Sequence, residues 1–288
     1  MDHDELLFPP GQPIRLTEVA TTMDGGFADD EAAQASVRAD GERIRRAQDL
    51  LMAHETRGLL VLFQGMDASG KDEAIRDVLG ALDPRAVEFK AFKQQNEKEL
   101  RHDYLWRTWQ ALPARGQVGV FNRSHYEHVA GERVRPDALD EQHLPDCARE
   151  DVWAKRLRQI NDVERYLVEN GITVLKFFLH QSKGEQRRRL LARMEAPETR
   201  WQFSPADIKA RARWDDYMEA YSEALTETNT EAAPWHVVPA DREWVARAAV
   251  ASVVAETLEG FHEGYPEPTE EEAEELEKGR AALLSEGD

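Results

Sequence analysis

The fold is decided by one stretch of the chain, Leu59–Asp72, with the sequence LLVLFQGMDASGKD. Its apolar first half predicts a buried strand, and two glycines with four residues between them, followed by a lysine, are typical of a phosphate-binding loop. The glycines allow successive backbone N–H groups to turn towards an anion, and the next helix directs the positive end of its dipole at the same point. The residues that we expect to bind phosphate are Gly65, Met66, Ala68, Ser69, Gly70 and Lys71.

Two carboxylates distinguish this loop from the usual pattern. The residue after the lysine is normally Ser or Thr, whose hydroxyl binds magnesium, but here it is Asp72, and Asp67 lies inside the loop. These carboxylates would repel a bound phosphate unless metal ions lay between the carboxylates and the phosphate. The segment 71–82 has apolar residues at helical spacing, so the loop has a strand before it and a helix after it. This context predicts phosphoryl transfer with bound Mg²⁺.

The composition is that of a globular protein with a large core. The chain has 288 residues, of which 41% are hydrophobic. No segment approaches the roughly 20 apolar residues of a membrane span, and the acidic start MDHDELLFPPGQP lacks the order of a signal peptide. A single cysteine, Cys147, excludes an internal disulfide and fits a reducing compartment. We therefore expect a cytoplasmic protein that does not enter a membrane.

The net charge of -19 argues against nonspecific nucleic-acid binding, and the charge is unevenly distributed. Both ends of the chain are acidic, whereas basic residues gather in the middle. These are Lys90, Lys93, Arg101, Arg107, Arg115, Arg123, Arg133, Arg135 and Arg187–Arg189. We therefore expect a local cationic channel within an acidic body.

Five apolar segments predict strands, and helical patterns lie between them. The strands are 59–64, 87–92, 117–121, 173–179 and 235–239, and the helices are 31–54, 72–82, 97–112, 152–169, 184–194, 205–228 and 242–261. Strands that are apolar throughout and alternate with helices indicate an α/β fold, in which a parallel five-stranded sheet is covered by helices on both faces.

Polar residues at the end of the third strand are expected to face the loop. Ligands of open α/β sheets bind outside the carboxyl ends of the strands, where Asn122 can contact metal-bound water and Arg123 can contact phosphate. Arg133, further along, is a candidate for a second phosphate. Ser124 and Glu127 have the spacing of a capping box, so we interpret them as the start of a helix.

A lid is predicted after the fourth strand. Ser182 and Glu185 form a second capping box ahead of an arginine-rich helix, and the sequence PETRW at 197–201 interrupts that helix. Small-molecule kinases need a mobile, arginine-bearing lid to exclude water and to neutralise charge in the transition state. We favour a lid over a plain helical hairpin, although three successive arginines cannot all face one way on a helix.

Three motifs together resemble the second family of polyphosphate kinases. They are GMDASGKD at 65–72, FNRSHYE at 121–127 and EQRRRLLARMEAPETRWQFS at 185–204, and the similarity covers about residues 40–262. The resemblance implies a P-loop kinase similar to thymidylate kinases, with a three-layer α/β/α core and a helical lid. Such enzymes move a terminal phosphoryl group between inorganic polyphosphate and a nucleotide, with Mg²⁺ or Mn²⁺. The second motif looks like the branch that phosphorylates both nucleoside mono- and diphosphates.

The resemblance also implies roles for the matching residues. Asp67 would orient metal and the attacking acceptor phosphate, and Asp72 would support metal. Nucleotide phosphates would be bound by Asn122, Arg123 and Arg133. Arg188 and Arg189 would close over the transferred group, and Lys90 and Lys93 would line the polyphosphate path. One departure is the sequence QQN at 94–96, where the family pattern has a proline-containing turn. The implied partners are adenine nucleotides, with guanine as a further candidate, and further copies of the chain in a homo-oligomer.

The expected organisation is an N-terminal extension and helix (1–45), a P-loop kinase core (46–262) with its lid at about 183–215, and an acidic tail (263–288). Two other functions are alternatives to a polyphosphate-dependent kinase. An ATP-dependent nucleoside monophosphate kinase would have Ser or Thr after the lysine, which Asp72 contradicts. A non-catalytic polyphosphate- or nucleotide-binding protein would tolerate the loss of Asp67 or Asp72, yet both are present.

Overall fold

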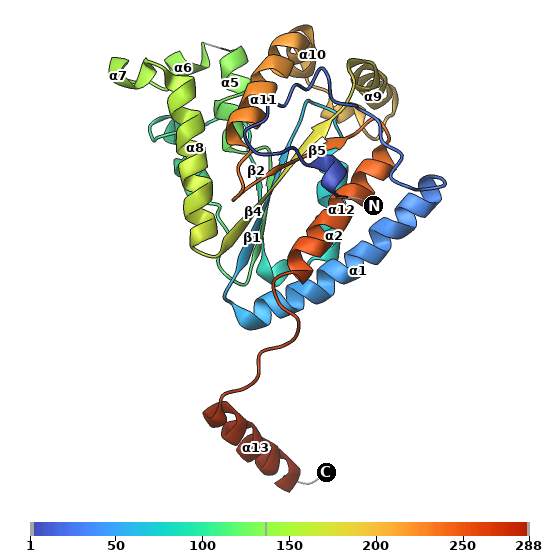
Figure 1. Ribbon diagram of the computed structural model, residues 1–288, viewed down its shortest axis with the longest axis vertical. Coiled ribbons are helices and arrows are strands. Elements are labelled where there is room, and N and C mark those ends of the chain that lie inside the picture. The colour runs from blue at the N-terminus through green and yellow to red at the C-terminus, as the bar shows by residue number, and fades with distance from the viewer. Residues whose placement is uncertain (1–2, 136, 287–288) are drawn as a thin grey trace.

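One parallel sheet organises the molecule (Figure 1). The structure is a computed structural model that describes residues 3–135 and 137–286. Its strands are β1 (Gly58–Gln64), β2 (Val87–Ala91), β3 (Val118–Asn122), β4 (Ile172–His180) and β5 (Trp235–Pro239). Their order across the sheet is β2-β3-β1-β4-β5, and every neighbouring pair is parallel. The predicted strands are therefore confirmed, each to within one residue at either end.

Helices cover both faces of the sheet, so the predicted three layers are confirmed. The helices that pack against the sheet are α1 (Asp30–His54), α2 (Lys71–Ala81), α8 (Val152–Glu169), α11 (Trp214–Thr228) and α12 (Glu243–Glu259). Leu59, Val61 and Phe63 of the central strand pack in one buried cluster with α1, α2 and α12. Leu60 and Leu62 point to the opposite face and pack with α8 and α11. Burial on both faces explains why β1 is apolar at every position from 59 to 63.

The rest of the described chain forms further helices and single turns. The remaining helices are α3 (Glu97–Leu100), α4 (Trp106–Trp109), α5 (Gly131–Val134), α6 (Ala138–Glu141), α7 (Asp146–Arg149), α9 (Lys183–Glu195), α10 (Pro205–Ala212) and α13 (Glu270–Ser285). Single 3₁₀ turns are η1 (Asp4–Leu6), η2 (Pro84–Ala86), η3 (His125–His128) and η4 (Arg200–Gln202).

The prediction of a continuous helix over 97–112 is wrong. The segment forms only α3 and α4, with turns between them. Helix α3 ends at Leu100, and Asp103 then starts a turn, because its carboxylate accepts a hydrogen bond from the backbone N–H of Leu105 at 3.0 Å. A side chain that bonds its own backbone in this way competes with helix hydrogen bonds. The break also turns Arg107 inward, where it is buried.

The helix predicted over 205–228 is divided at Arg213 into α10 and α11. Arg213 leaves helical geometry, with φ −106° and ψ 29°. Its guanidinium donates to the backbone carbonyl of Val134 and to Asp216. This tertiary anchor separates α10, which falls in the predicted lid, from α11, which packs on the sheet.

The two ends of the chain differ in packing. At the N-terminus, Leu6, Ile14 and Leu16 are at most 1% exposed, and Leu7 forms an antiparallel bridge with His236 of the edge strand β5. The C-terminal helix α13 has no buried residue and stands away from the body in Figure 1. Across the described ranges, no helix has the length and hydropathy needed to span a membrane. The domain boundaries given above stay a prediction.

Candidate active site

The loop between β1 and α2 depends on its two glycines. Gly65 has φ 142°, and a Cβ at this position would lie 2.6 Å from the carbonyl oxygen of Leu179. Gly70 forms the N-cap of α2 with φ 95°. Residues with side chains rarely adopt these conformations. The glycines therefore shape a loop whose backbone turns directly into the N-terminus of α2, a favourable place for an anion.

The ammonium of Lys71 lies inside this loop. It donates hydrogen bonds to the carbonyl oxygens of Gly65 at 2.8 Å and Met66 at 2.9 Å, and to Ser69 Oγ at 3.3 Å. Burial, and next the positive charge of Arg123, lower the pKa of Lys71 to about 8. A phosphate bound beside the ammonium would favour its charged form and raise this pKa again.

Adjacent strands bring polar partners to both carboxylates of the loop. In the parallel register Phe63 of β1 pairs with Asn122 of β3, so the carboxyl ends of the two strands lie side by side. The Asn122 amide donates to Asp72 Oδ1 at 2.6 Å. Arg123 forms an ion pair with Asp67. Four of the residues singled out in the sequence are thus gathered around the loop.

Arg123 is held in place by its backbone and by two carboxylates. Its backbone adopts φ 60° and its N–H donates to the carbonyl of Phe63 at 3.0 Å. Glu127 accepts from its guanidinium at 3.2 Å. The charge of Glu127, against the opposing effect of burial, and then the charge of Asp67 raise the pKa of Arg123. Ser124 caps the turn η3, as the sequence predicts. Glu127 instead bonds Arg123, a role that its sequence spacing did not predict.

Helix α9, which begins the predicted lid, reaches the loop through Arg189. The Arg189 guanidinium donates to the carbonyl oxygen of Ala68 at 3.2 Å and to that of Ala240 at 2.5 Å. Arg188 points elsewhere: it pairs with Glu185, and its side chain is 67% exposed. Two buried amides, Gln181 and Gln186, also donate to the carbonyl of Asp67, at 2.8 and 3.1 Å. Gln181 directly follows β4, so the rule for strand ends could have singled it out.

A cavity of about 720 Å³ opens beside Asp67 and Arg123. This is the size of a typical small-molecule site. It lies between the segment after β2, helices α5 and α6, and helices α10 and α11. Its basic lining residues are Lys93, Arg107, Arg123, Arg135, Lys209 and Arg213, and its acidic ones are Asp67, Glu127, Glu132, Asp137, Glu141 and Asp207. Tyr217, Phe92 and Leu100 add apolar surface.

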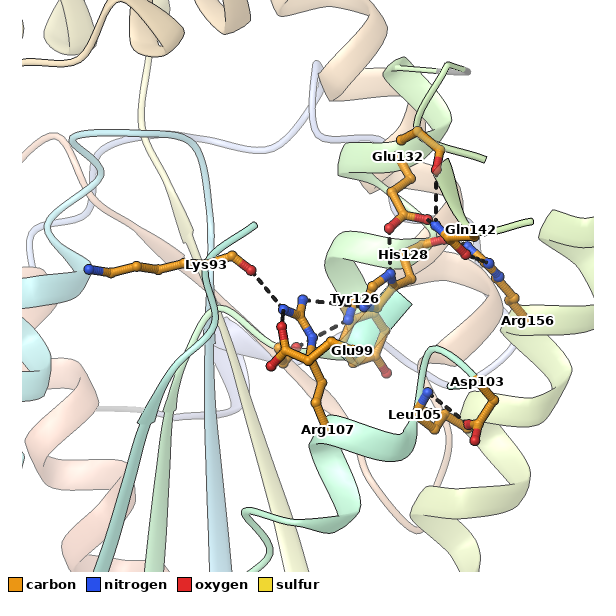
Figure 2. A network of polar contacts seen from close by, with 12 residues as sticks. Lys93, Glu99, Asp103, Leu105, Arg107, Tyr126, His128, Glu132, Gln142 and Arg156 are labelled. Carbon is orange, nitrogen blue, oxygen red and sulfur yellow. Dashed lines mark hydrogen bonds and ion pairs between the residues drawn. The ribbon is translucent and has the colours of Figure 1, made fainter. Parts of the chain in front are cut away.

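One wall of this cavity is fixed by a polar network (Figure 2). Arg107 donates to the carbonyl of Lys93 at 2.7 Å and contacts His128 at 3.3 Å. His128 bonds Glu132 at 2.5 Å, and Arg156 pairs with Glu132 at 2.7 Å. Burial raises the pKa of Glu132, but its bonds to His128 and the charges of His128 and Arg156 outweigh burial and lower that pKa to about 2. Glu132 is therefore a permanent, rigid carboxylate in the wall.

Besides Arg188, two predicted site residues lie away from the phosphate loop and the cavity. Arg133 pairs with Glu223 of α11 at 2.5 Å, and it is absent from the residues that line the cavity. Lys90 lies on the edge strand β2, whereas Lys93 beyond the strand end does line the cavity.

The carboxylates of the loop suit a divalent metal that also binds phosphate. Mg²⁺ is usually held by one or two carboxylates together with substrate phosphates and water, and Asp67 and Asp72 offer two such oxygen donors. In the described part of the chain no group of three or more His, Cys, Asp or Glu side chains could hold a metal alone. The donor set therefore fits a metal that is shared with a phosphate ligand.

Comparisons with known proteins agree with this geometry. A family model described as "Polyphosphate kinase 2 (PPK2)" matches residues 27–264. The chain is 44% identical over 276 residues to an ADP-polyphosphate phosphotransferase of Rhodopseudomonas palustris, covering 95% of this chain and 96% of that one. It is 43% identical to an AMP/ADP-polyphosphate phosphotransferase of Meiothermus ruber, covering 83% and 85% of the two chains. The crystal structure of polyphosphate kinase 2 from Arthrobacter aurescens TC1 matches with TM-score 0.86 and 37% identity, covering 98% of this chain and 95% of that chain.

Proposed function

Because this chain belongs to the polyphosphate kinase 2 family, we propose that it transfers the terminal phosphoryl group of inorganic polyphosphate to a nucleotide. The acceptors are AMP, which becomes ADP, and ADP, which becomes ATP, while polyphosphate is shortened by one unit; the reaction is reversible. The observation that carries this proposal is the meeting of Asp67, Lys71, Asp72, Asn122 and Arg123 at the adjoining ends of β1 and β3. Relatives named for ADP alone and for AMP and ADP together support the choice of acceptors.

The acceptor nucleotide is proposed to occupy the cavity beside Asp67. Its lining combines cations with carboxylates such as Glu132 and Glu141, and carboxylates repel a chain that is anionic along its whole length. A nucleotide matches this lining in two ways. Its phosphates can bind Arg123, and its polar, uncharged base and sugar can contact the part of the lining that contains both cations and carboxylates. Polyphosphate then approaches the loop where Lys71 and Arg189 lie, with Arg188 on its proposed path and Arg133 as a further phosphate contact. Lys93 lines the cavity itself and Lys90 lies on the neighbouring strand β2, so we assign these two lysines to the nucleotide side instead of the polyphosphate path.

The chain's own residues supply positioning and charge. Asp67 and Asp72 would hold Mg²⁺ or Mn²⁺, which neutralises phosphate charge when it is bound. Lys71 and the amides of Gly65, Met66, Ala68, Ser69 and Gly70 hold the transferred group. Arg123 orients the attacking acceptor oxygen, and Arg189 faces the charge that develops in the transition state. Phosphoryl transfer needs little covalent chemistry from the protein, so these contacts account for catalysis.

The direct test mixes the protein with Mg²⁺, long-chain polyphosphate and AMP, and then separates the nucleotides by ion-exchange chromatography. We expect ADP and then ATP, both dependent on polyphosphate. Formation of ADP alone would restrict the acceptor to AMP. If ATP replaced polyphosphate as the donor and polyphosphate gave no product, the chain would be an ordinary nucleotide kinase and the proposal would be wrong.

Filling the cavity should weaken nucleotide binding alone. Ala138 lines the cavity, and Ala138→Phe adds a ring to it. We expect the KM for ADP to rise about tenfold, in line with the loss of roughly 1.4 kcal/mol of binding, while the KM for polyphosphate changes less than twofold. Steady-state kinetics with each substrate varied in turn measures both values. Equal increases in the two KM values would place the nucleotide elsewhere.

The pKa of Lys71 predicts how the reaction depends on pH. The ammonium binds phosphate only while it is protonated, and its pKa in the free protein is about 8. kcat/KM for polyphosphate should therefore be level below about pH 8 and fall above it, because this parameter reports the free enzyme. In Lys71→Arg the side chain stays positively charged above pH 8. The fall in kcat/KM should therefore disappear, even if the variant is slower than wild type at every pH. A decline that persisted in the arginine variant would assign it to another group.

A homo-oligomer and a cytoplasmic location complete the proposal. The outer edge of β2 carries Phe89, which is 49% exposed, between Glu88 and Lys90. Antiparallel pairing of two such edges about Phe89 would set each Glu88 opposite a Lys90 of the other copy. Light scattering tests the assembly, since a particle of 32.9 kDa would be a monomer.

A further inference from the structure

The N-terminal strap, residues 3–24, precedes the part of the chain that the family model matches, which begins at residue 27. In Figure 1 the dark-blue strap crosses the end of the sheet beside α11 before the chain enters α1. Ile14 and Leu16 are buried in the same cluster as Trp214 and Tyr221 of α11. The strap is therefore packed against the helix that returns from the lid to the core.

Two hydroxyls fasten the strap to α11. The backbone N–H of Ile14 donates to Thr226 Oγ1 at 2.8 Å, and that of Leu16 donates to Ser222 Oγ at 3.1 Å. Ser222 and Thr226 are four residues apart, so their hydroxyls lie on one face of the helix. These bonds fix the strap along α11 without contacting α9.

A third contact connects the strap to the start of the lid. Thr21 Oγ1 donates to Asp241 Oδ2 at 2.8 Å, and the N–H of Asp241 donates to the carbonyl of Thr21 at 2.9 Å. The other carboxylate oxygen, Asp241 Oδ1, accepts from the backbone N–H of Ser182 at 2.7 Å. Ser182 is the N-cap of α9, where its own hydroxyl accepts from Glu185. One carboxylate thus holds the strap and the N-cap residue of α9 together.

The same segment receives the lid arginine. Arg189 donates to the carbonyl oxygens of Ala240 at 2.5 Å and Asp241 at 3.4 Å, while its other terminal nitrogen donates to Ala68 in the phosphate loop. A continuous series of hydrogen bonds therefore runs from Thr21 through Asp241 to α9 and Arg189, and from there to the loop. Moving Asp241 would move both the start of α9 and the carbonyls on which Arg189 rests.

We propose that Thr21 and Asp241 are positioning residues that set the place of Arg189 for phosphoryl transfer. Neither residue lines the nucleotide cavity, so they act through the lid helix. This inference rests on the proposed function. Its physical basis is that a catalytic cation displaced by about 1 Å can lose up to about 100-fold in rate while ground-state binding is largely kept.

Thr21→Val removes the hydroxyl that bonds Asp241 and keeps the shape of the side chain. We expect kcat with polyphosphate and ADP to fall about tenfold, with the KM for ADP changed less than twofold, because the cation acts mainly in the transition state. Thr21→Ser, which restores the hydroxyl, should recover at least half of the wild-type kcat. The matched control is Thr226→Val, which loses a strap hydrogen bond of the same 2.8 Å length but leaves Asp241 untouched.

A second measurement separates this inference from the proposed function. Hydrogen exchange at the Ser182 amide should become faster in Thr21→Val and stay unchanged in Thr226→Val, whether or not the protein transfers phosphate. If wild-type protein is inactive with polyphosphate, the proposed function fails while the exchange result still tests the coupling. Equal losses of kcat in the two valine variants, or an unchanged Ser182 exchange rate in Thr21→Val, would overturn the positioning role and leave the strap as a stabilising contact only.

Discussion

Replacing Asp67 with asparagine is expected to lower kcat for polyphosphate-dependent ATP formation by about a thousandfold, the scale of losing a preorganised charge at the reacting group. Asp67 is 19% exposed and paired with Arg123, and both line the cavity proposed for the nucleotide. The amide has nearly the same shape but no charge to offer a metal, and it binds Arg123 more weakly. Binding of ADP should change only a few-fold, because the other cations of the cavity remain.

The experiment pairs a rate with an affinity. Turnover is followed by ATP formation, and ADP affinity is measured by calorimetry on the same sample of Asp67→Asn. The control is Asp77→Asn, which neutralises another aspartate just beyond the loop, on α2, paired at 2.5 Å with Arg247 rather than with the site. The control should lose stability but keep its rate. Turnover of Asp67→Asn within tenfold of wild type would show that Asp67 is dispensable.

Removing divalent metal should abolish turnover, again by about a thousandfold or more, and added Mg²⁺ or Mn²⁺ should restore it. Two carboxylates beside a polyphosphate are a net repulsion unless a cation lies among them. Asn122 satisfies only one oxygen of Asp72, at 2.6 Å, which leaves the carboxylate capacity for a further ligand. The measurement is turnover after chelation, followed by titration with each metal.

The share of Asp72 in metal binding can be separated from its bond to Asn122. In Asp72→Asn the Mg²⁺ concentration for half-maximal turnover should rise about tenfold, equivalent to roughly 1.4 kcal/mol, while saturating Mg²⁺ recovers much of the rate. Asp83→Asn, which removes an exposed ion pair with Arg85, should leave the requirement unchanged. An unchanged requirement in Asp72→Asn would reduce Asp72 to a partner of Asn122, and retained turnover under chelation would remove metal from the mechanism.

The sheet and the phosphate loop could be predicted because local sequence determines them. Continuous apolar runs and the glycines at 65 and 70 are sufficient signals for a buried parallel strand and for the turn into α2. Asn122 could be placed because parallel strands end at one edge of a sheet. The breaks at Asp103 and Arg213 could not be foreseen in this way. They depend on a side chain that bonds the backbone in one case and on a contact with the distant Val134 in the other.

The cavity lining was the least predictable part of the site. Arg107 and Arg213 were two basic residues among many in the sequence, and only the folded chain brings them to one cavity. The spacing of Glu127 from Ser124 predicts a helix cap, and the same spacing is compatible with its observed ion pair with Arg123, so sequence alone does not separate the two roles. The strap contact of Thr21 with Asp241 spans 220 residues, and no local pattern encodes it.

The register of β1 against β3 has a consequence for which measurement first detects imperfect packing in this protein. Phe63 lies opposite Asn122, so the separation between the phosphate loop and the residues that follow β3 is set by a ladder of backbone hydrogen bonds. A slip of one residue would shift Asn122 by about 3.3 Å and reverse the faces of its strand. A smaller displacement between these strands would likewise move Asn122 relative to the loop. We therefore expect imperfect repacking between β1 and β3 to lower turnover before it lowers the melting temperature, so a screen for stabilised variants should measure the rate first.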